Sequence, residues 1–358
     1  MSKFLSKKFE NLEPYVPGEQ PRDKKYIKLN TNESPFPPSK KSQKAAEDAA
    51  RNLQLYPDPE CRRLSEKMAE FYRVSPDEVL MTNGSDEILN FAFMAFCDER
   101  HTAVFPDITY GFYPVFSEIN SVPFEEIPLK EDFTIDINDY LGIGKTVFLA
   151  NPNAPTGIAL DISDIEKIVA SNPKNVVVID EAYVDFGAKS AVSLIHKYDN
   201  LLVTQTFSKS RSLAGGRLGM GIGNAALISD LNAIKYSTNP YNINTVTQSM
   251  GLAIMEDGFY TSANCQIISE IRDYTAKELK KLGFTLTDSR ANFVFAKHKY
   301  LDGETLYKKL KDKGILVRHF STDRIKDYNR ITIGTLEQME ALINAIKEIL
   351  EDTKDENC

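Results

Sequence analysis

The chain of 358 residues is poor in cysteine and histidine, with four of each. The cysteines are scattered without a Cys-x-x-Cys pair, and the histidines never fall at the spacing of metal ligands. These absences argue against a zinc site and against a framework of disulfides. We expect no metal ion and buried free thiols.

Long apolar runs and an excess of basic residues are also missing. No run approaches the roughly 20 residues of a membrane-spanning helix, and the N-terminus lacks the apolar stretch of a signal peptide. The formal charge is −8, from 43 basic and 51 acidic side chains, without a visible basic stripe. We therefore expect a cytoplasmic protein whose partners are neither membranes nor nucleic acids.

The chain does contain apolar strand-like runs that alternate with helical patterns between about residues 39 and 250. This alternation predicts an α/β fold with a doubly wound, mostly parallel sheet. The segments after it predict a smaller α+β domain. We predict an extended N-terminal arm at 1–38, a large ligand-binding domain at 39–250, and a small C-terminal domain at 251–358 that includes parts of the arm.

Two of the buried-looking strands lead into ionisable residues. The run 176–179 is followed by Asp180, and the run that begins at Leu201 leads to Lys209. Ligands bind outside the carboxyl ends of parallel strands, so the two side chains are expected to meet there. A buried carboxylate without a partner costs roughly several kcal/mol. A structural salt bridge between Asp180 and Lys209 is one interpretation, and a ligand is the other.

Residues that suit a phosphate surround these two. Arg217 follows Lys209 in a glycine-rich segment, and Thr206 and Ser208 add hydroxyl donors. Ser85 is predicted to cap a helix whose free backbone N–H groups would face an anion, although a merely well-capped helix is the simpler interpretation.

Pyridoxal 5′-phosphate is a ligand that needs all of these groups together. Its aldehyde forms a Schiff base with a lysine, its ring nitrogen takes an acidic partner, and its phosphate needs amides and a cation. The sequence therefore predicts a site for this cofactor.

Four segments carry a family resemblance. They are Asn-Pro-Asn-Ala-Pro-Thr-Gly at 151–157, Asp-Glu-Ala-Tyr at 180–183, Thr-Phe-Ser-Lys at 206–209, and Arg217. In order and spacing they resemble the signature of the fold-type I, class I and II aminotransferases of the aspartate aminotransferase superfamily. Other segments, near residues 15, 28, 56, 83 and 330, resemble those of its histidinol-phosphate aminotransferase group.

The resemblance implies a role for each matching residue at the cofactor. Lys209 would form the Schiff base and carry the proton, Asp180 would pair with the pyridinium nitrogen, and Tyr183 would hydrogen-bond the ring hydroxylate. Tyr110 would stack on the ring, although a core aromatic stripe is another interpretation of that residue. The phosphate would be held by the backbone amides of Ser85 and Asp86 and by Thr206, Ser208 and Arg217.

Substrate and subunit contacts are implied as well. Arg330 would bind the carboxylate of glutamate and, with Tyr15 and Arg318, a substrate phosphate; Asn32 would also lie at the substrate. Tyr56 would reach the cofactor phosphate of a neighbouring subunit, which implies a homodimer with active sites at its interface. From the residues alone, ordinary packing explains both tyrosines equally simply, and a surface ion pair explains Arg318.

One position departs from the family pattern. The family usually has asparagine directly before Pro-Thr-Gly, where it donates to the ring hydroxylate, but this chain has Ala154 there and Asn153 one position earlier. Either Asn153 or Tyr183 alone would serve that oxygen, so Asn153 joins the candidate cofactor-binding residues.

The activity implied by the resemblance converts histidinol phosphate and 2-oxoglutarate to imidazole acetol phosphate and glutamate, in histidine biosynthesis. An aminotransferase for aromatic amino acids is one alternative, and a decarboxylase similar to the threonine-phosphate decarboxylases is another. A non-catalytic transcription factor is disfavoured, because only about 38 residues precede the body, too few for a DNA-binding domain.

Overall fold

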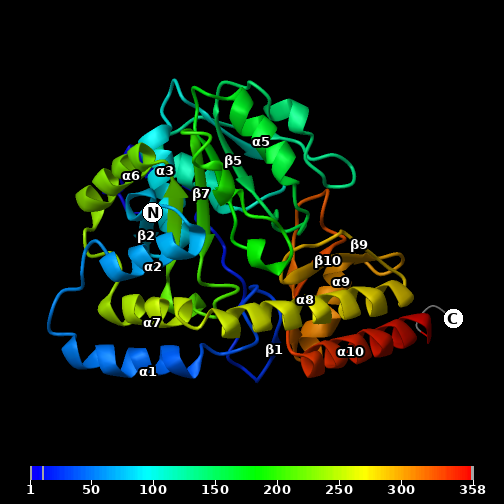
Figure 1. The fold of residues 1–358 in the computed structure, drawn as a ribbon. Helices are drawn as coiled ribbons and strands as arrows, with labels where there is room; N and C mark the ends of the chain where they lie inside the picture. Colours follow the sequence, from blue (N-terminus) through cyan, green and yellow to red (C-terminus); the bar gives the residue numbers. More distant parts are fainter. Residues whose placement is uncertain (1, 10–11, 356–358) are drawn as a thin grey trace.

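The computed structural model describes residues 2–9 and 12–355, and the described chain has a large and a small lobe (Figure 1). The large lobe contains a seven-stranded sheet in the order β2-β8-β7-β6-β5-β3-β4. β8 runs antiparallel to both of its neighbours, and the other strand pairs are parallel. The predicted α/β fold is confirmed. The strands are β2 Val79–Thr82, β3 Ala103–Pro106, β4 Phe124–Ile127, β5 Thr146–Ala150, β6 Val177–Asp180, β7 Leu201–Thr206 and β8 Gly219–Gly223.

Helices cover both faces of this sheet, which explains why its central strands are continuously apolar. Along β6, Val177 and Ile179 pack into one core cluster and Val178 packs into the cluster on the opposite face. Both faces of the strand are therefore shielded from water. The helices of the large lobe are α1 Lys40–Ala49, α2 Arg62–Tyr72, α3 Ser85–Phe96, α4 Phe112–Asn120, α5 Ile162–Ser171, α6 Ala225–Thr238 and α7 Thr245–Met255.

The small lobe packs helices against a four-stranded antiparallel sheet in the order β12-β13-β10-β9. The helical stretch after residue 244 is divided into α7 and α8 by a break at Glu256 and Asp257. The extended segment 315–319 is likewise divided between two sheets, because β11 pairs with β1, Ile27–Lys28, and β12 pairs with β13. The elements are α8 Gly258–Lys281, α9 Gly303–Asp312, α10 Leu336–Asp355, β9 Phe284–Leu286, β10 Phe293–His298, β11 Ile315–Leu316, β12 Arg318–His319 and β13 Asn329–Thr332.

The N-terminal arm lies partly on the small lobe of its own chain. Its strand β1, Ile27–Lys28, pairs in parallel with β11, and Leu29 is buried in the small-lobe core. In contrast, Ile254 and Met255 of α7 pack into the large-lobe core. The arm thus packs with the small lobe, whereas Ile254 and Met255, which the predicted boundary at residue 250 assigned to the small domain, pack with the large lobe. The division into domains remains our proposal.

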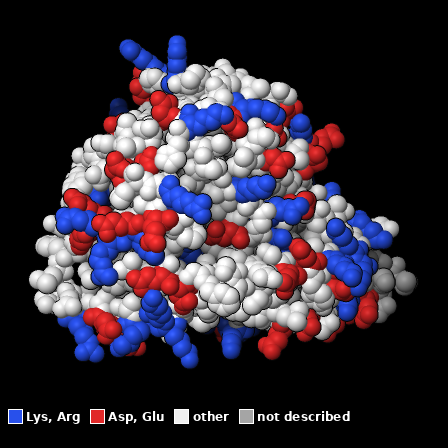
Figure 2. All heavy atoms as spheres, viewed as in Figure 1, with Lys and Arg blue, Asp and Glu red and all other residues white. Residues whose placement is uncertain are grey.

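The surface shows basic and acidic side chains interspersed over the face seen in Figure 2. Among the described residues, no helix combines the length and apolar character needed to cross a membrane. The same part of the chain contains no group of three or more His, Cys, Asp or Glu side chains placed to hold a metal ion.

Candidate active site

Two adjoining cavities form a cleft at the carboxyl ends of the central strands. The inner cavity, about 340 Å³, and the outer cavity, about 370 Å³, share Thr31, Tyr110, Ala154, Tyr183 and Lys209 along their walls. Nine predicted cofactor residues line the inner cavity: Ser85, Asp86, Tyr110, Asp180, Tyr183, Thr206, Ser208, Lys209 and Arg217. The predicted substrate residues Tyr15, Asn32, Arg318 and Arg330 line the outer cavity.

Asp180 ends β6 and is 4% exposed. Its Oδ2 accepts a hydrogen bond from the hydroxyl of Tyr113 at 3.2 Å, and its Oδ1 accepts one from the backbone N–H of Ala182 at 3.2 Å. Burial, and then the charge of Asp86, raise the pKa of Asp180 to about 7. In the described part of the chain no ion pair joins Asp180 to Lys209, so the structural salt bridge is not formed. The buried acid instead faces the cavity, where a cationic group of a ligand would stabilise its ionised form.

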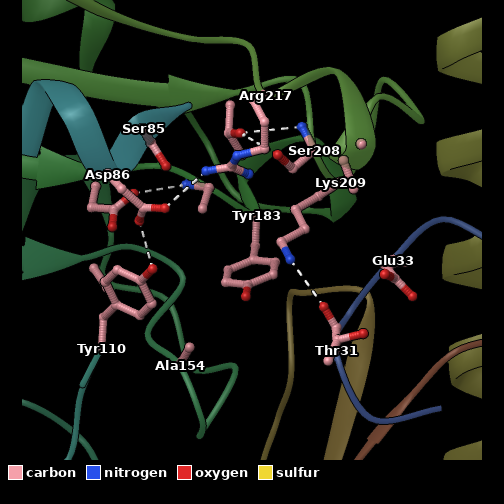
Figure 3. Close-up of a pocket in the computed structure, with 16 residues that line it drawn as sticks. Thr31, Glu33, Ser85, Asp86, Tyr110, Ala154, Tyr183, Ser208, Lys209 and Arg217 are labelled. Atoms are coloured by element: carbon pink, nitrogen blue, oxygen red, sulfur yellow. Dashed lines mark hydrogen bonds and ion pairs between the residues drawn. The ribbon is translucent and has the colours of Figure 1, made fainter. Parts of the chain in front are cut away.

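Lys209 lies three residues beyond β7, in the turn that carries the chain towards Arg217. Its ammonium donates a hydrogen bond to the backbone carbonyl of Thr31 at 3.1 Å, as Figure 3 shows. Burial, and then the charge of Arg330, lower the pKa of Lys209 to about 8. A substantial fraction of the amine is therefore neutral near pH 7 to 8, which is the form that attacks a carbonyl.

The anion end of the inner cavity lies at the start of α3. The N-cap residue is Gly84 with φ 76°, so the prediction that Ser85 caps the helix is wrong. The positive φ favours glycine there, and a Cβ on Gly84 would lie 2.5 Å from Nη2 of Arg217 and would displace that side chain. A Cβ on Gly219 would likewise lie 2.4 Å from the backbone nitrogen of Ser85. The two glycines let the arginine and β8 approach the free N–H groups of the helix, which bind anions.

The side chains around this helix start already form a polar network. Nη2 of Arg217 donates to Oδ2 of Asp86 at 3.0 Å, and the hydroxyl of Thr206 donates to that of Ser208 at 3.0 Å (Figure 3). Asp86 therefore contributes its carboxylate to the site in addition to the backbone amide that the sequence predicted.

Two tyrosines lie along the shared wall. The hydroxyl of Tyr110 donates to Oδ1 of Asp86 at 2.6 Å, while its ring contacts Tyr113 edge-on at 5.7 Å. The ring of Tyr110 contacts the aromatic core and also lines the cleft, and its stacking on the cofactor stays a prediction. The hydroxyl of Tyr183 accepts a hydrogen bond from Nδ2 of Asn32 at 2.9 Å.

Asn153 does not line either cavity. Its side-chain amide donates to the carbonyl of Ile108 at 2.9 Å and to the hydroxyl of Thr156 at 3.1 Å, and its Oδ1 accepts from Thr109 at 2.7 Å. These bonds commit Asn153 to the surrounding loops, whereas Ala154 lines both cavities. The structure therefore does not support the predicted contact of Asn153 with the cofactor, and Tyr183 is the remaining candidate for the contact with the ring hydroxylate.

Arg330 and Arg318 lie opposite each other on the antiparallel strands β13 and β12. Arg330 is half-buried and lines the outer cavity; its Nη2 donates to the carbonyl of Asn30 at 3.1 Å, and its buried Nε has no partner among the described residues. Arg318 donates to the carbonyls of Val16 and Pro17 at 3.3 and 3.4 Å, rather than forming a surface ion pair. Both guanidinium groups therefore retain donor capacity for an anion.

Comparisons with known proteins agree with this geometry. The family model of the class I and II aminotransferases matches residues 24–346. The chain belongs to the class I and II aminotransferases. Its sequence is 51% identical to the histidinol-phosphate aminotransferase of Brachyspira hyodysenteriae, over 98% of this chain and 100% of the relative. It is 46% identical to the enzyme of that name from Clostridium botulinum strain Kyoto, over 98% and 99%.

A solved structure shares the aminotransferase fold over nearly the whole chain. The histidinol-phosphate aminotransferase of Sinorhizobium meliloti, solved with pyridoxal-5′-phosphate, superposes with a TM-score of 0.90 over 99% of each chain. Its sequence is 21% identical, so this likeness concerns the fold.

The inner cavity of this aminotransferase fits pyridoxal 5′-phosphate. A buried acid without a cationic partner suits the ring nitrogen, and a partly neutral lysine suits the aldehyde. The close approach of Arg217 to the start of α3 suits the phosphate. The fit rests on these side chains and on the two glycines that leave room between them.

Tyr56 is a predicted cofactor residue that, like Asn153, lies outside the cleft of its own chain. Its side chain is 82% exposed, stacks on Tyr241 with ring centroids 4.6 Å apart, and lines neither cavity. A residue that serves a partner subunit would be placed in this way.

Sequence reasoning missed Thr31, Tyr113 and the carboxylate of Asp86. Thr31 directly precedes Asn32 in a segment that resembles the family, so that segment was a usable signal. Tyr113 lay in an aromatic run that also suits a core, and nothing in the sequence pairs it with Asp180.

Proposed function

We propose that this aminotransferase uses pyridoxal 5′-phosphate to transfer the amino group of histidinol phosphate to 2-oxoglutarate, as a step of histidine biosynthesis. The names of relatives that are 46 to 51% identical over nearly the whole chain support the substrate. The observation that carries the proposal is the cleft itself. Lys209 lines both the inner cavity, which holds the predicted cofactor residues, and the outer cavity, which contains Arg318 and Arg330.

We assign the catalytic work of this chain to three residues. The bound cofactor supplies an electron-withdrawing ring that stabilises negative charge at the substrate Cα. Asp180 holds a proton on the ring nitrogen, which maintains that withdrawal. Lys209, whose amine lies towards Thr31, would accept the proton from the substrate Cα and deliver it to C4′ of the cofactor. Tyr183 donates to the ring hydroxylate and is oriented by Asn32.

We assign substrate binding to the two arginines. The Nε of Arg330 is buried without a partner among the described residues, and an unpartnered donor on a guanidinium favours an anionic ligand. A planar guanidinium binds the carboxylate of an oxo acid and the phosphate of an amine donor with similar geometry. Arg318 and Tyr15 lie nearer the mouth, where they would complete the phosphate site.

We propose that the enzyme is a homodimer whose active sites are completed across the interface. The support is Tyr56, whose exposed ring stacks on Tyr241 and which follows the exposed Leu53 and Leu55 in the sequence. An apolar group of this kind suits a protein interface. The cytoplasmic location stays a prediction.

Single-turnover experiments with a panel of amine donors test the substrate. The purified holoenzyme is mixed with histidinol phosphate, histidinol, phenylalanine or phosphothreonine, and loss of the cofactor's resting absorbance is followed. We expect histidinol phosphate to react fastest, and histidinol to reveal the contribution of the phosphate. A rate for phenylalanine equal to that for histidinol phosphate would contradict the assignment, and carbon dioxide from phosphothreonine would favour a decarboxylase.

Covalent labelling tests the cofactor attachment independently of the donor. Borohydride reduction of the holoenzyme is expected to place the label on the peptide that contains Lys209. A label on another peptide would overturn the role of this lysine.

A further inference from the structure

The hydroxyl of Tyr113 is the one side-chain hydrogen-bond donor to Asp180 among the described residues. It donates to Oδ2 at 3.2 Å, and Tyr113 is fully buried in the first turn of α4. The ring is held by aromatic contacts with Phe105, Tyr110 and Phe148, at centroid distances of 5.6, 5.7 and 5.9 Å. The direction of the hydroxyl is therefore set by packing.

Two of the carboxylates that line the inner cavity, Asp86 and Asp180, each accept a tyrosine hydroxyl but differ in their other partners. Asp86 accepts from Tyr110 and is also paired with the guanidinium of Arg217 at 3.0 Å. Asp180 has no such cation, so Tyr113 and the backbone N–H of Ala182 are the donors that stabilise its charge. Removing one of two donors from a buried carboxylate favours its neutral form.

We propose that Tyr113 is a positioning residue that keeps Asp180 ionised and aimed at the cofactor's ring nitrogen. The inference rests on the proposed function through the identity of the cofactor. It extends that function because Tyr113 lines neither cavity and acts only through Asp180.

The charges around Asp180 show why this hydrogen bond matters. Burial and the carboxylate of Asp86, from α3, raise the pKa of Asp180, whereas the hydroxyl of Tyr113, the Ala182 N–H and the charge of Lys209 lower it. The result, about 7, lies close to neutral pH. Loss of one donor then changes the ionised fraction of Asp180 substantially, because at pH 7 the carboxyl group is close to half ionised.

The test compares two cofactors bound to the Tyr113→Phe variant. This substitution retains the packed ring and removes only the hydroxyl. Dissociation constants are measured at pH 7 for pyridoxal 5′-phosphate and for its 1-deaza analogue, in which a carbon replaces the ring nitrogen. The wild type is expected to prefer the natural cofactor. In the variant this preference is expected to fall about fivefold, because raising a pKa near 7 by about one unit lowers the ionised fraction at pH 7 from about one half to about one tenth. An equal loss for both cofactors, or no loss, would overturn the proposal.

Tyr140→Phe is the matched control. Tyr140 is another buried tyrosine, and its hydroxyl has no partner among the described residues. We expect its removal to leave the preference for the natural cofactor unchanged. A change in the control equal to that in Tyr113→Phe would show that the effect is general to buried tyrosines and would overturn the role of the hydrogen bond.

A second variant covers the case in which Tyr113→Phe does not fold. Incorporation of 3-fluorotyrosine at position 113 keeps the ring and makes the hydroxyl a stronger donor. The preference for pyridoxal 5′-phosphate over the deaza analogue is then expected to increase, and an unchanged preference would contradict the proposal. Because these measurements use no amine donor, their failure is distinct from failure of the donor assignment.

Discussion

The two cavities of the cleft are assembled in different ways. The inner cavity takes most of its polar side chains from turns that follow strands of one sheet, and its charges partly balance, as in the pair of Arg217 with Asp86. The outer cavity joins the N-terminal arm, the large lobe and two small-lobe strands. Among the described residues, Arg318 and Arg330 donate hydrogen bonds only to backbone carbonyls, and neither forms an ion pair with a carboxylate. One cavity is therefore suited to hold a cofactor permanently, and the other to receive an anionic substrate.

The difference predicts separable effects on catalysis and on binding. Substitutions in the inner cavity should alter turnover or cofactor chemistry, and substitutions in the outer cavity should alter the dependence on substrate concentration. Each prediction below tests this separation, beginning with the largest expected effect.

Asp180→Ala should lower kcat by about 10² to 10³-fold, the range typical for loss of a preorganised electrostatic partner. The cofactor should remain attached through Lys209, because the phosphate and lysine contacts are intact. Steady-state kinetics and the absorbance of the purified variant measure the two properties. Near-normal turnover would show that the ring nitrogen does not depend on this acid.

Capture of pyridoxal 5′-phosphate by the apo-protein should accelerate with pH. Burial lowers the pKa of Lys209 to about 8, so its neutral fraction increases about tenfold per unit below that pH and levels off above it. Stopped-flow absorbance between pH 6 and 10 measures the rate. A rate that continues to rise to pH 10 would indicate an ordinary, solvated lysine.

Arg330→Lys should lower kcat/KM by about 10 to 100-fold, mainly through KM, because an ammonium cannot replace a bidentate guanidinium. Arg318→Lys is the comparison, and we expect a smaller effect because Arg318 lies nearer solvent. Both donor and oxo-acid concentrations are varied. A larger loss for Arg318 than for Arg330 would reverse the assigned importance of the two residues.

Gly219→Ala should destabilise the protein by roughly 1 to 3 kcal/mol, the usual range for overpacking. The added Cβ would lie 2.4 Å from the backbone of Gly84 and Ser85. Gly215→Ala is the matched control in the same cavity wall, since its Cβ would meet nothing within 4 Å. Thermal unfolding with and without cofactor compares the two, and equal melting temperatures would show that the backbone at Gly84 yields easily.

The sequence alone determined the inner cavity well. Strands such as β6 and β7 are marked by continuous apolar runs, and a parallel sheet necessarily brings their carboxyl ends together. Asp180 and Lys209 could therefore be placed at one site from local patterns. The resemblance of the surrounding motifs then supplied the expected roles of Tyr183, Ser208 and Arg217.

Tertiary structure decided what local patterns could not. Sequence spacing does not show that Asn153 is committed to neighbouring loops, that Gly84 rather than Ser85 caps α3, or that Tyr113 donates to Asp180. Sequence spacing also does not predict the hydrogen bond from Arg330 to the carbonyl of Asn30, which joins residues 300 positions apart. The physical reason is that hydrogen-bond partners and shared cavities depend on how packed elements meet, whereas periodicity reports only the faces of single elements.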